Sequence, residues 1–349
     1  MNILITGNLG YIGPVLTKFI KNNFNNSKIT GYDTGFFSSN KLILGKDKYL
    51  DKQIIGDIRN FDKMHLNKIN AVIHLCAISN DPIGNKFKNI THEINYKASE
   101  RLLEKVCRSS VESFTFASSC SVYGSGGKLI KNENDTLKPL TAYAKSKINF
   151  EKLIEKFSKK TSGKYFTSLR FPTACGMSPM LRLDLVLNDF ICSAINEKKI
   201  VLLSDGKAWR PLIDVKDMSK AMLWGISRKG KNNLSINTGS NKNNFMIKEL
   251  AKKVQNLLPG KIQLEINEVN KSDKRSYKVD FSKFSKIASE YKSNIPIDNT
   301  IMELYNGISN QKVNLNNFRQ STFMRLIALE KLIKDKKINK NLFWKNGKK

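Results

Sequence analysis

Tyr143 and Lys147 are the residues whose types and spacing most directly suggest chemistry. They stand four positions apart on one face of a helix expected over residues 142–159. The phenol of a free tyrosine has a pKa near 10, and a neighbouring ammonium favours the phenolate. We therefore expect Lys147 to lower the pKa of Tyr143. Serines 118, 119 and 121 follow the strand expected over 113–117. Ligands of open α/β sheets lie beyond such strand ends, which makes Tyr143 a candidate for proton transfer there.

A glycine-rich turn lies between the first expected strand (2–6) and the first expected helix (14–22). Its glycines stand at positions 7, 10 and 13. In this setting the first permits a tight turn, the second lets a diphosphate approach the backbone, and the third allows close packing of helix on strand. The sequence therefore predicts a dinucleotide site formed by Gly7, Asn8, Leu9, Gly10, Tyr11, Ile12 and Gly13.

Two acidic residues follow the next strands. Asp33 ends the strand expected over 28–33, where a carboxylate would accept hydrogen bonds from ribose hydroxyls and repel a 2′-phosphate. NAD is therefore favoured over NADP, although Asp33 could also be a simple turn residue before Thr34. Asp57 and Ile58 follow the strand expected over 53–56 and could contact the adenine. An ordinary acid at a strand end explains Asp57 equally well.

Strand and helix signals alternate along the first half of the chain. A continuous apolar run at 71–78 predicts a fully buried strand, and a helix is expected over 95–107. This order predicts a doubly wound α/β fold, Rossmann-like, with a parallel sheet covered on both faces. We expect a dinucleotide domain over 1–177, with 209–239 returning to it through a helix at 215–227 and a strand at 234–238. Residues 178–208 and 240–349 would form a smaller α+β substrate lobe, with helices at 184–197 and 247–258 and strands at 200–203 and 261–266.

Charge is the most unusual feature of the composition. The 349 residues hold 60 Lys and Arg against 30 Asp and Glu, a net charge of +30. The lysines are scattered among asparagines, as a codon bias would produce, so nucleic-acid binding is not favoured. Residues 311–349 concentrate nine Lys and two Arg against one Glu and one Asp. Phe323, Leu326, Leu329 and Ile333 there have helical spacing, which predicts a basic amphipathic helix docked on the protein's own body. Binding of phosphate or of a partner is the less favoured alternative.

Other classes of protein are not indicated. No apolar run reaches the roughly 18 residues of a membrane span, and the first residues lack a signal-peptide pattern, so we expect a soluble cytoplasmic protein. Five cysteines without Cys-x-x-Cys spacing and three histidines predict neither a disulfide framework nor a metal site.

The order and spacing of these motifs resemble the extended short-chain dehydrogenase/reductase family, particularly its nucleotide-sugar epimerases and dehydratases. The shared segments are 6–13, Gly56 to Arg59, His74 to Ala77, Ser118 to Gly124, Tyr143 to Lys147, Arg170 to Gly176, and Arg210 to Asp217. The resemblance implies that Tyr143 is the catalytic acid or base, that Lys147 also holds the nicotinamide ribose, and that Ser119 hydrogen-bonds the reacting oxygen. It further implies cofactor contacts from Leu75 and Ala77 and a homodimer formed through the helices at 95–107 and 142–159.

The same resemblance separates possible reactions. Dehydratases of this kind carry Asp and Glu after the catalytic Thr, where this chain has Cys120 and Ser121. Epimerases acting at carbons 3 and 5 carry a Cys at the position of Ser121, and strand alternation would turn Cys120 to the opposite face. We therefore expect an NAD-dependent nucleotide-sugar 4-epimerase. A keto-sugar reductase, a dehydrogenase or a dehydratase of the same family remains open, as does a non-catalytic dinucleotide-sensing or nucleic-acid-associated protein.

A nucleotide-sugar substrate carries a diphosphate, which arginine forks bind well. Arg210 and Arg275 resemble the family's diphosphate arginines, and Arg182 is a third candidate without that precedent. Thr173 replaces the Asn usual at its position. The remaining predicted substrate contacts are Ser79, Asn80, Ser121 and Asn188.

Overall fold

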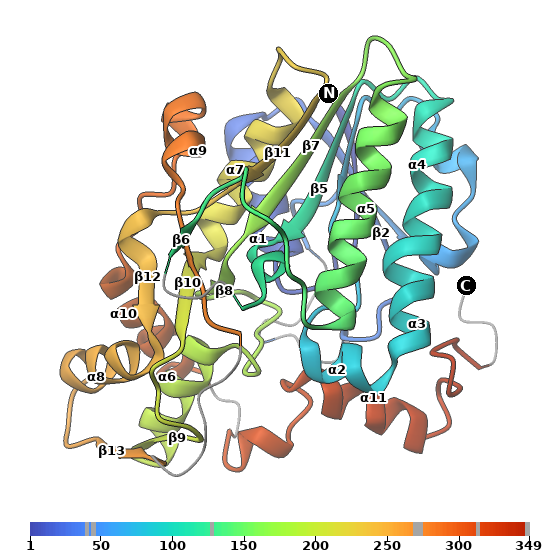
Figure 1. Cartoon of the computed structure of the whole chain (residues 1–349). Helices are drawn as coiled ribbons and strands as arrows, with labels where there is room; N and C mark the ends of the chain where they lie inside the picture. Colours follow the sequence, from blue (N-terminus) through green and yellow to red (C-terminus); the bar gives the residue numbers. More distant parts are fainter. Residues whose placement is uncertain (39–41, 43–46, 126–128, 268–274, 312–314, 346–349) are drawn as a thin grey trace.

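A parallel β-sheet forms the centre of the computed structural model, which describes residues 1–38, 42, 47–125, 129–267, 275–311 and 315–345. Its strand order is β11-β7-β5-β4-β1-β2-β3, and every neighbouring pair is parallel. Figure 1 shows these strands side by side between layers of helices. The strands are β1 (Asn2–Thr6), β2 (Lys28–Asp33), β3 (Lys52–Ile55), β4 (Ala71–His74), β5 (Ser113–Ser119), β7 (Tyr165–Phe171) and β11 (Asn233–Asn237). This is the doubly wound α/β fold predicted from the sequence.

Helices cover both faces of the sheet. On one face α1 (Gly13–Asn23) packs beside α7 (Val215–Ser227). The other face carries α5 (Ala142–Ser158) and α4 (Ser99–Cys107), which a π-helical turn at Glu93–Ala98 precedes. The short helices α2 (Asp81–Lys86) and α3 (Lys88–His92) lead into that turn. The pleat of β1 explains the two layers, because Leu4 points into the cluster under α4 and α5 while Ile3 and Ile5 point toward α1 and α7.

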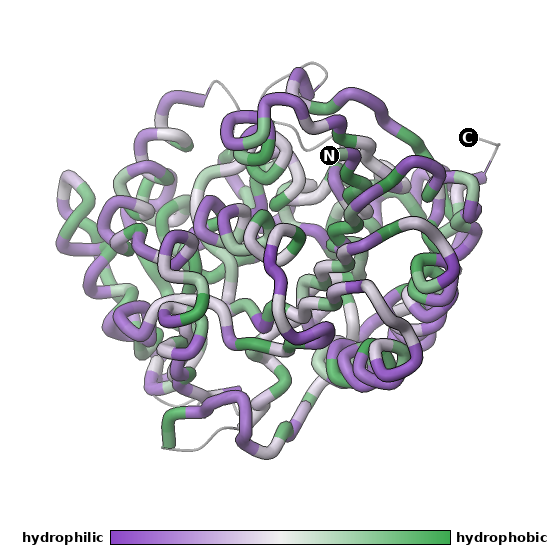
Figure 2. Tube along the Cα trace, turned by 90° about the horizontal axis from the view of Figure 1, so that it is seen from above, coloured by the Kyte–Doolittle hydropathy of each residue, from purple (hydrophilic) through white to green (hydrophobic). Residues whose placement is uncertain are grey.

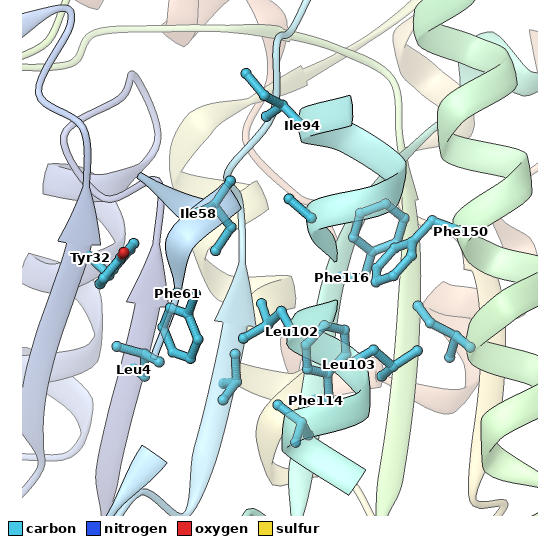
Figure 3. Close-up of a cluster of buried hydrophobic side chains, with 14 of the residues drawn as sticks. Leu4, Tyr32, Ile58, Phe61, Ile94, Leu102, Leu103, Phe114, Phe116 and Phe150 are labelled. Carbon is cyan, nitrogen blue, oxygen red and sulfur yellow. The ribbon is translucent and has the colours of Figure 1, made fainter. Parts of the chain in front are cut away.

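Aromatic rings fill the space between the sheet and α4 and α5 (Figure 3). The rings of Phe116 and Phe150 meet edge to face with centroids 4.7 Å apart. Both side chains are fully or almost fully buried. Burial of such rings stabilises a fold by a few kcal/mol each, so this cluster fixes α5 against β5. The position of α5 matters because this helix carries Tyr143 and Lys147.

The remaining elements form a second unit beside the carboxyl end of the sheet. A separate sheet has the order β12-β10-β8, and two strand pairs, β13-β9 and β14-β6, lie apart from it. A second apolar cluster holds α6, α8 and α10 together. The elements are β6 (Ile130–Lys131), β8 (Thr173–Cys175), β9 (Lys199–Leu202), β10 (Trp209–Asp214), β12 (Asn244–Met246), β13 (Gln263–Ile266), β14 (Lys278–Val279), α6 (Val186–Asn196), α8 (Ile247–Leu257) and α10 (Ile297–Ser309). Helix α9 (Ser282–Ile287) instead packs on the main sheet beside β11, with Phe284 against Trp224 of α7.

The basic C-terminal segment folds back onto the protein. Helix α11 (Arg325–Lys334) packs against α2 at the carboxyl end of the sheet (Figure 1). Leu329 is buried in the main apolar cluster, whereas Lys331 and Lys334 are exposed. The predicted amphipathic helix and its docking are confirmed, although Phe323 precedes the helix. Figure 2 shows hydrophilic stretches recurring along the outer turns of the chain, with hydrophobic stretches among them toward the interior.

Some elements differ from the sequence-based expectations. The buried strand expected over 71–78 ends at His74, and the residues after it turn into the wall of a cavity. Strand β7, which lies between β5 and β11, was not expected from the sequence. Within the segment 209–239, α7 and β11 return to the main sheet, but β10 pairs with β8 and β12 instead. The division of the chain into two domains stays a prediction.

Candidate functional site

A cavity of about 990 Å³ opens at the carboxyl ends of the parallel strands, between the two units. The strand order reverses beside β1, because the chain passes from β3 to β4 on the other side of it, and ligands of such sheets bind at this point. The structure brings most of the predicted site residues to this one cavity. They are Gly7, Gly10, Tyr11, Ile12, Asp33, Asp57, Ile58, Leu75, Ala77, Ser79, Asn80, Ser119, Ser121, Tyr143, Lys147, Thr173, Arg182, Arg210 and Arg275.

The glycine-rich turn has the geometry that a dinucleotide needs. Gly7 has φ +80°, and a Cβ on it would lie 2.6 Å from the backbone nitrogen of Cys76, so a side chain does not fit. A Cβ on Gly13 would collide with the backbone of Asn8 where α1 meets the turn. Gly10 lies at the cavity wall. The backbone is thus exposed at the N-terminus of α1, where an anion is favoured, and the turn fits the diphosphate of NAD.

Asp33 stands at the end of β2, at the wall of the same cavity. Its carboxylate accepts hydrogen bonds from the N–H groups of Leu9 at 3.1 Å and of Gly35 at 2.8 Å. Burial raises the pKa of this carboxyl, and the two hydrogen bonds oppose that effect. The N–H of Leu9 is therefore used in a hydrogen bond to Asp33. The carboxylate lies at the cavity wall, where the predicted contact with the ribose requires it.

Two other predicted cofactor contacts have structural partners. Asp57 holds Arg59, with Oδ2 2.5 Å from Nη2, and accepts the backbone N–H of Arg59 at 2.9 Å. This arrangement favours the alternative of a structural acid at a strand end, although Asp57 and Ile58 still line the cavity. Asn8 is turned inward, where its Nδ2 donates to Gln53 at 2.7 Å. The Asn8 side chain is not available to a cofactor, because this hydrogen bond joins the glycine-rich turn to Gln53 of β3.

Ser119, Tyr143 and Lys147 meet at the cavity from two elements. Thr141 caps the start of α5 by accepting the N–H of Ala144 at 3.2 Å, which places Tyr143 in the first turn of the helix. Ser119 ends β5, its Oγ accepts the N–H of Ser121 at 3.1 Å, and it stands near enough to Tyr143 to lower the pKa of that phenol. Lys147 lies one turn further along α5 and is almost fully buried. A substrate hydroxyl in the cavity can reach a proton acceptor here.

The pKa values differ from the sequence-based expectation. Burial raises the pKa of Tyr143 to about 12, with a smaller upward effect from Asp81, while Ser119 and Arg182 act in the opposite direction. Lys147 does not supply the predicted lowering. Its Nζ donates to the backbone oxygen of Ala117 at 2.7 Å and lies 5.4 Å from the centre of the Tyr143 ring. Burial also lowers the pKa of Lys147 to about 7, so its positive charge is only partly present at neutral pH.

The loop after β4 forms a polar wall opposite Tyr143. Arg182 pairs with Asp184, with Nε 2.9 Å from Oδ1, and its Nη1 donates to the Ser79 hydroxyl at 3.2 Å. Asn80 adopts φ +127° and donates from Nδ2 to Asp184 at 2.7 Å. Its Oδ1 also accepts the N–H of Ile83 at the start of α2. Asp184, which the sequence analysis did not single out, therefore holds this wall together.

The second unit supplies the other wall. Arg210 lies over the ring of Tyr277, with its guanidinium carbon 5.6 Å from the ring centre. Arg275 forms an ion pair with Asp81 of α2. The hydroxyl of Ser121 is buried at the cavity and has no hydrogen-bond partner within the described part of the chain. Thr173 also reaches the cavity. These side chains can bind a polar anionic ligand.

Asn188 has a different position from the predicted one. It is fully buried in α6 and does not line the cavity. Its Oδ1 accepts the N–H of Gly176 at 3.3 Å, and its Nδ2 donates to the backbone oxygen of Arg182 at 2.9 Å and to the Tyr11 hydroxyl at 3.2 Å. The amide groups are used to join the glycine-rich turn to the second unit, so the expected substrate contact is wrong.

Cys120 is buried and turned away from the cavity. Its Sγ contacts the backbone oxygen of Arg170 at 3.1 Å. Burial raises the pKa of this thiol well above its usual value. The structural interpretation of Cys120 is therefore supported, because a thiol in this position cannot act as a proton donor to a ligand.

A buried charged residue of the cavity wall lies outside all the predicted motifs. Arg325, the first residue of α11, is 2% exposed and lines the cavity. It stands four residues before Leu329, so the two side chains lie on the same side of the predicted helix. An arginine on the same side of the helix as a buried leucine was the sequence feature that could have indicated the position of Arg325.

Metal and membrane features can be stated only for the described residues. Within them, His, Cys, Asp and Glu side chains do not gather in a group of three or more that could hold a metal ion. The helices of the same residues include none that is both long and apolar enough to span a bilayer.

The fold and the site together define a nicotinamide-dinucleotide-binding α/β protein. The family model for the NAD dependent epimerase/dehydratase family matches residues 3–239. The chain therefore belongs to this family, whose cofactor is NAD.

Individual relatives differ in their reactions. A dTDP-D-glucose 4,6-dehydratase of Dictyostelium discoideum is 30% identical over 288 residues, which cover 73% of this chain and 62% of that protein. The match thus spans less than two thirds of the relative's length. The UDP-N-acetylglucosamine 4-epimerase from Methanobrevibacter ruminantium M1, solved with UDP-N-acetylmuramic acid, shares the fold with a TM-score of 0.75 and 22% identity. That alignment covers 89% of this chain and 99% of the epimerase. The UDP-glucuronic acid 4-epimerase from Bacillus cereus, solved with UDP-glucuronic acid and NAD, gives a TM-score of 0.72 at 22% identity, over 88% of this chain and 99% of its own.

Proposed function

We propose that the protein is an NAD-dependent nucleotide-sugar 4-epimerase that works through a keto-sugar. The observation that carries this proposal is the meeting of Ser119, Tyr143 and Lys147 in the cavity that the glycine-rich turn also lines. A proton-transfer group and a dinucleotide site in one pocket suit reversible oxidation of an alcohol. NAD, when bound, supplies the acceptor that takes a hydride from the sugar carbon and returns it.

The chain's own residues have distinct parts in this proposal. Tyr143 takes the proton from the sugar hydroxyl and later gives it back, while Ser119 holds the reacting oxygen by a hydrogen bond. Gly7 and Gly10 of the turn, with Asp33, would hold the cofactor. Lys147, whose Nζ donates to the Ala117 carbonyl oxygen, would hold the nicotinamide ribose.

Arg210 and Arg275 are proposed to bind the diphosphate of the nucleotide sugar. They stand on the second unit, across the cavity from the glycine-rich turn, and guanidinium groups suit phosphate oxygens. The UDP-sugars with which the two epimerases were solved favour a substrate of this class. Ser121, whose hydroxyl has no hydrogen-bond partner among the described residues, is a candidate contact for the sugar.

A 4,6-dehydratase is the second candidate, favoured by the Dictyostelium relative. Elimination of water needs an acid next to the sugar, and at the corresponding positions this chain has the buried Cys120 and the hydroxyl of Ser121. We therefore rank epimerisation above dehydration. A keto-sugar reductase or a dehydrogenase would use the same three residues but with a net change in the cofactor, since a reductase consumes reduced nicotinamide and a dehydrogenase releases it. A homodimer and a cytoplasmic location remain predictions from the sequence.

The test incubates the full-length chain with a panel of UDP- and dTDP-sugars without added cofactor. Proton NMR follows the configuration at carbon 4, and absorbance at 340 nm follows reduced nicotinamide. The proposal predicts interconversion of one pair of 4-epimers with no net reduction of the cofactor. Formation of a 4-keto-6-deoxy sugar would identify a dehydratase, and stoichiometric reduced cofactor would identify a dehydrogenase.

A further inference from the structure

The C-terminal segment, defined here as residues 318–345, covers the end of the cavity where Asp33 lies. The indole Nε1 of Trp344 donates to the backbone oxygen of Thr34 at 2.8 Å. Arg59 fixes the same segment, since its guanidinium donates to the backbone oxygens of Asn341 and Leu342, both at 2.7 Å. The segment is therefore attached to the strand ends on both sides of the expected adenosine site.

Arg325 extends from this segment into the cavity. Its guanidinium lies over the ring of Phe37, with the guanidinium carbon 4.1 Å from the ring centre. The Nη2 atom is 3.4 Å from the backbone oxygen of Met180, a long contact for a hydrogen bond. The Nη1 atom is buried and has no hydrogen-bond partner among the residues that the structure describes. A buried guanidinium with an unsatisfied donor is costly unless an anion joins it.

A second positive charge stands nearby. Burial lowers the pKa of Arg325 to about 9, and repulsion from Arg182 adds to this, while Asp184 and Asp33 act in the opposite direction. Arg182 already donates to both carboxylate oxygens of Asp184, from Nε to Oδ1 at 2.9 Å and from Nη2 to Oδ2 at 3.1 Å. Asp33 accepts two backbone N–H groups. Both carboxylates are thus hydrogen-bonded to other groups, and within the described part of the chain neither of them accepts a hydrogen bond from Arg325.

The proposed function would bring two diphosphates into the cavity, that of NAD and that of the nucleotide sugar. The position of Arg325 indicates which of the two it can bind. Asp33 and Phe37, which adjoin Arg325, belong to β2 and the segment directly after it. Arg210 and Arg275, the candidates for the substrate diphosphate, stand on the second unit beside Tyr277. Arg325 thus belongs to the cofactor side.

We propose that Arg325 is a ligand of the NAD diphosphate, and that residues 318–345 hold it over the bound dinucleotide. This inference rests on the family's NAD cofactor and on the site placement in the proposed function. It gives the basic C-terminal segment a specific use, because the segment then closes the dinucleotide site opposite the glycine-rich turn. An epimerase benefits from such a contact, since the cofactor must remain bound while the keto-sugar rotates in the cavity and is reduced on its other face.

The experiment measures equilibrium binding of ADP-ribose and of UDP to the full-length chain, freed of any co-purified dinucleotide. The variant is Arg325→Met, which keeps an apolar stem over Phe37 and removes the charge. Loss of a charge-assisted hydrogen bond predicts ADP-ribose binding weaker by about 10- to 100-fold, with UDP binding changed by less than about threefold. Lys331→Met removes an exposed charge from the same helix and should leave both affinities within about twofold.

The melting temperature without ligand separates binding from folding. Because the guanidinium is buried with an unsatisfied donor, Arg325→Met should melt at the wild-type temperature or above it. Unchanged ADP-ribose affinity, or a loss confined to UDP, would overturn the proposal, and a lower melting temperature with normal ADP-ribose binding would assign Arg325 a structural role. A chain that binds ADP-ribose through Arg325 but converts no sugar nucleotide would refute the proposed function alone.

Discussion

Lys147 stands beside Tyr143 at the cavity, but its hydrogen bond goes to the main chain. The Nζ atom is 5.4 Å from the centre of the Tyr143 ring and 2.7 Å from the Ala117 oxygen. The two residues have opposite pKa shifts, and burial is the main cause of both. Proton transfer by Tyr143 then depends on the ligands that fill the site and on the Ser119 hydroxyl.

Replacement of Tyr143 by Phe tests its role in proton transfer. We expect kcat to fall by about 10²- to 10⁴-fold or more, because general acid-base catalysis contributes about this much. ADP-ribose affinity should stay near the wild-type value, since the ring is kept. Tyr291→Phe, a residue away from the cavity wall, is the matched control and should retain activity. Substantial turnover by Tyr143→Phe, measured by NMR, is incompatible with the proposed role.

Removal of the Ser119 hydroxyl should change the pH dependence of the reaction. The nearby Ser119 side chain opposes the burial that raises the pKa of Tyr143, so Ser119→Ala should raise this pKa further. The rise of kcat with pH should then shift to higher pH, and kcat at neutral pH should fall by about tenfold or more. An unshifted profile with a lower plateau would mean that Ser119 acts only by positioning the substrate.

Burial of Lys147 predicts a pH-dependent stability. Its pKa is about 7 in the folded protein and about 10.5 in an unfolded chain, so the unfolded state binds more protons between these values. The free energy of unfolding of the wild type, relative to Lys147→Met, should therefore rise with pH from about 7 to 10, by at most about 1.4 kcal/mol per pH unit. Urea unfolding at pH 6, 8 and 9.5 measures this difference. Lys145→Met, an exposed neighbour on α5, should show a flat difference, and a flat result for Lys147→Met would contradict the buried charge.

Arg210→Met tests the proposed substrate side of the cavity. Loss of a guanidinium contact to the diphosphate should raise KM for the nucleotide sugar by about tenfold or more, with a smaller effect on kcat. ADP-ribose affinity should not change, because Arg210 is on the second unit. Lys207→Met removes an exposed charge close by in the sequence and is the control. If Arg210→Met weakens ADP-ribose binding instead, the two sides of the cavity are assigned wrongly.

Local patterns explain how much of this site could be predicted from the sequence. Gly7, Gly10 and Gly13 act within one turn, and Tyr143 and Lys147 act within one helix, so their spacing is visible along the chain. The alternation of strands and helices predicts a parallel sheet, and in such a sheet the end of β5 brings Ser119 to the same edge as the glycine-rich turn.

Long-range packing explains what could not be predicted. Asn188 and Tyr11 are 177 residues apart, and their hydrogen bond turns Asn188 away from the cavity. The pKa of Tyr143 depends on burial and on Asp81 and Arg182, which reach it from other elements. Arg325 enters the cavity only because the C-terminal segment returns to Thr34 and Arg59. Contacts of this kind arise from the packing of distant segments, and residue spacing does not encode them.

Transfer of deuterium from carbon 4 tests the central claim most directly. The full-length chain is incubated in ordinary water with its nucleotide sugar deuterated at carbon 4, and NMR and mass spectrometry follow the label. If the same hydride leaves and returns within one cavity, the epimer keeps its deuterium at carbon 4 and gains no solvent hydrogen on the ring. Loss of the label, its appearance at carbon 6, or exchange at carbon 3 or 5 would contradict 4-epimerisation.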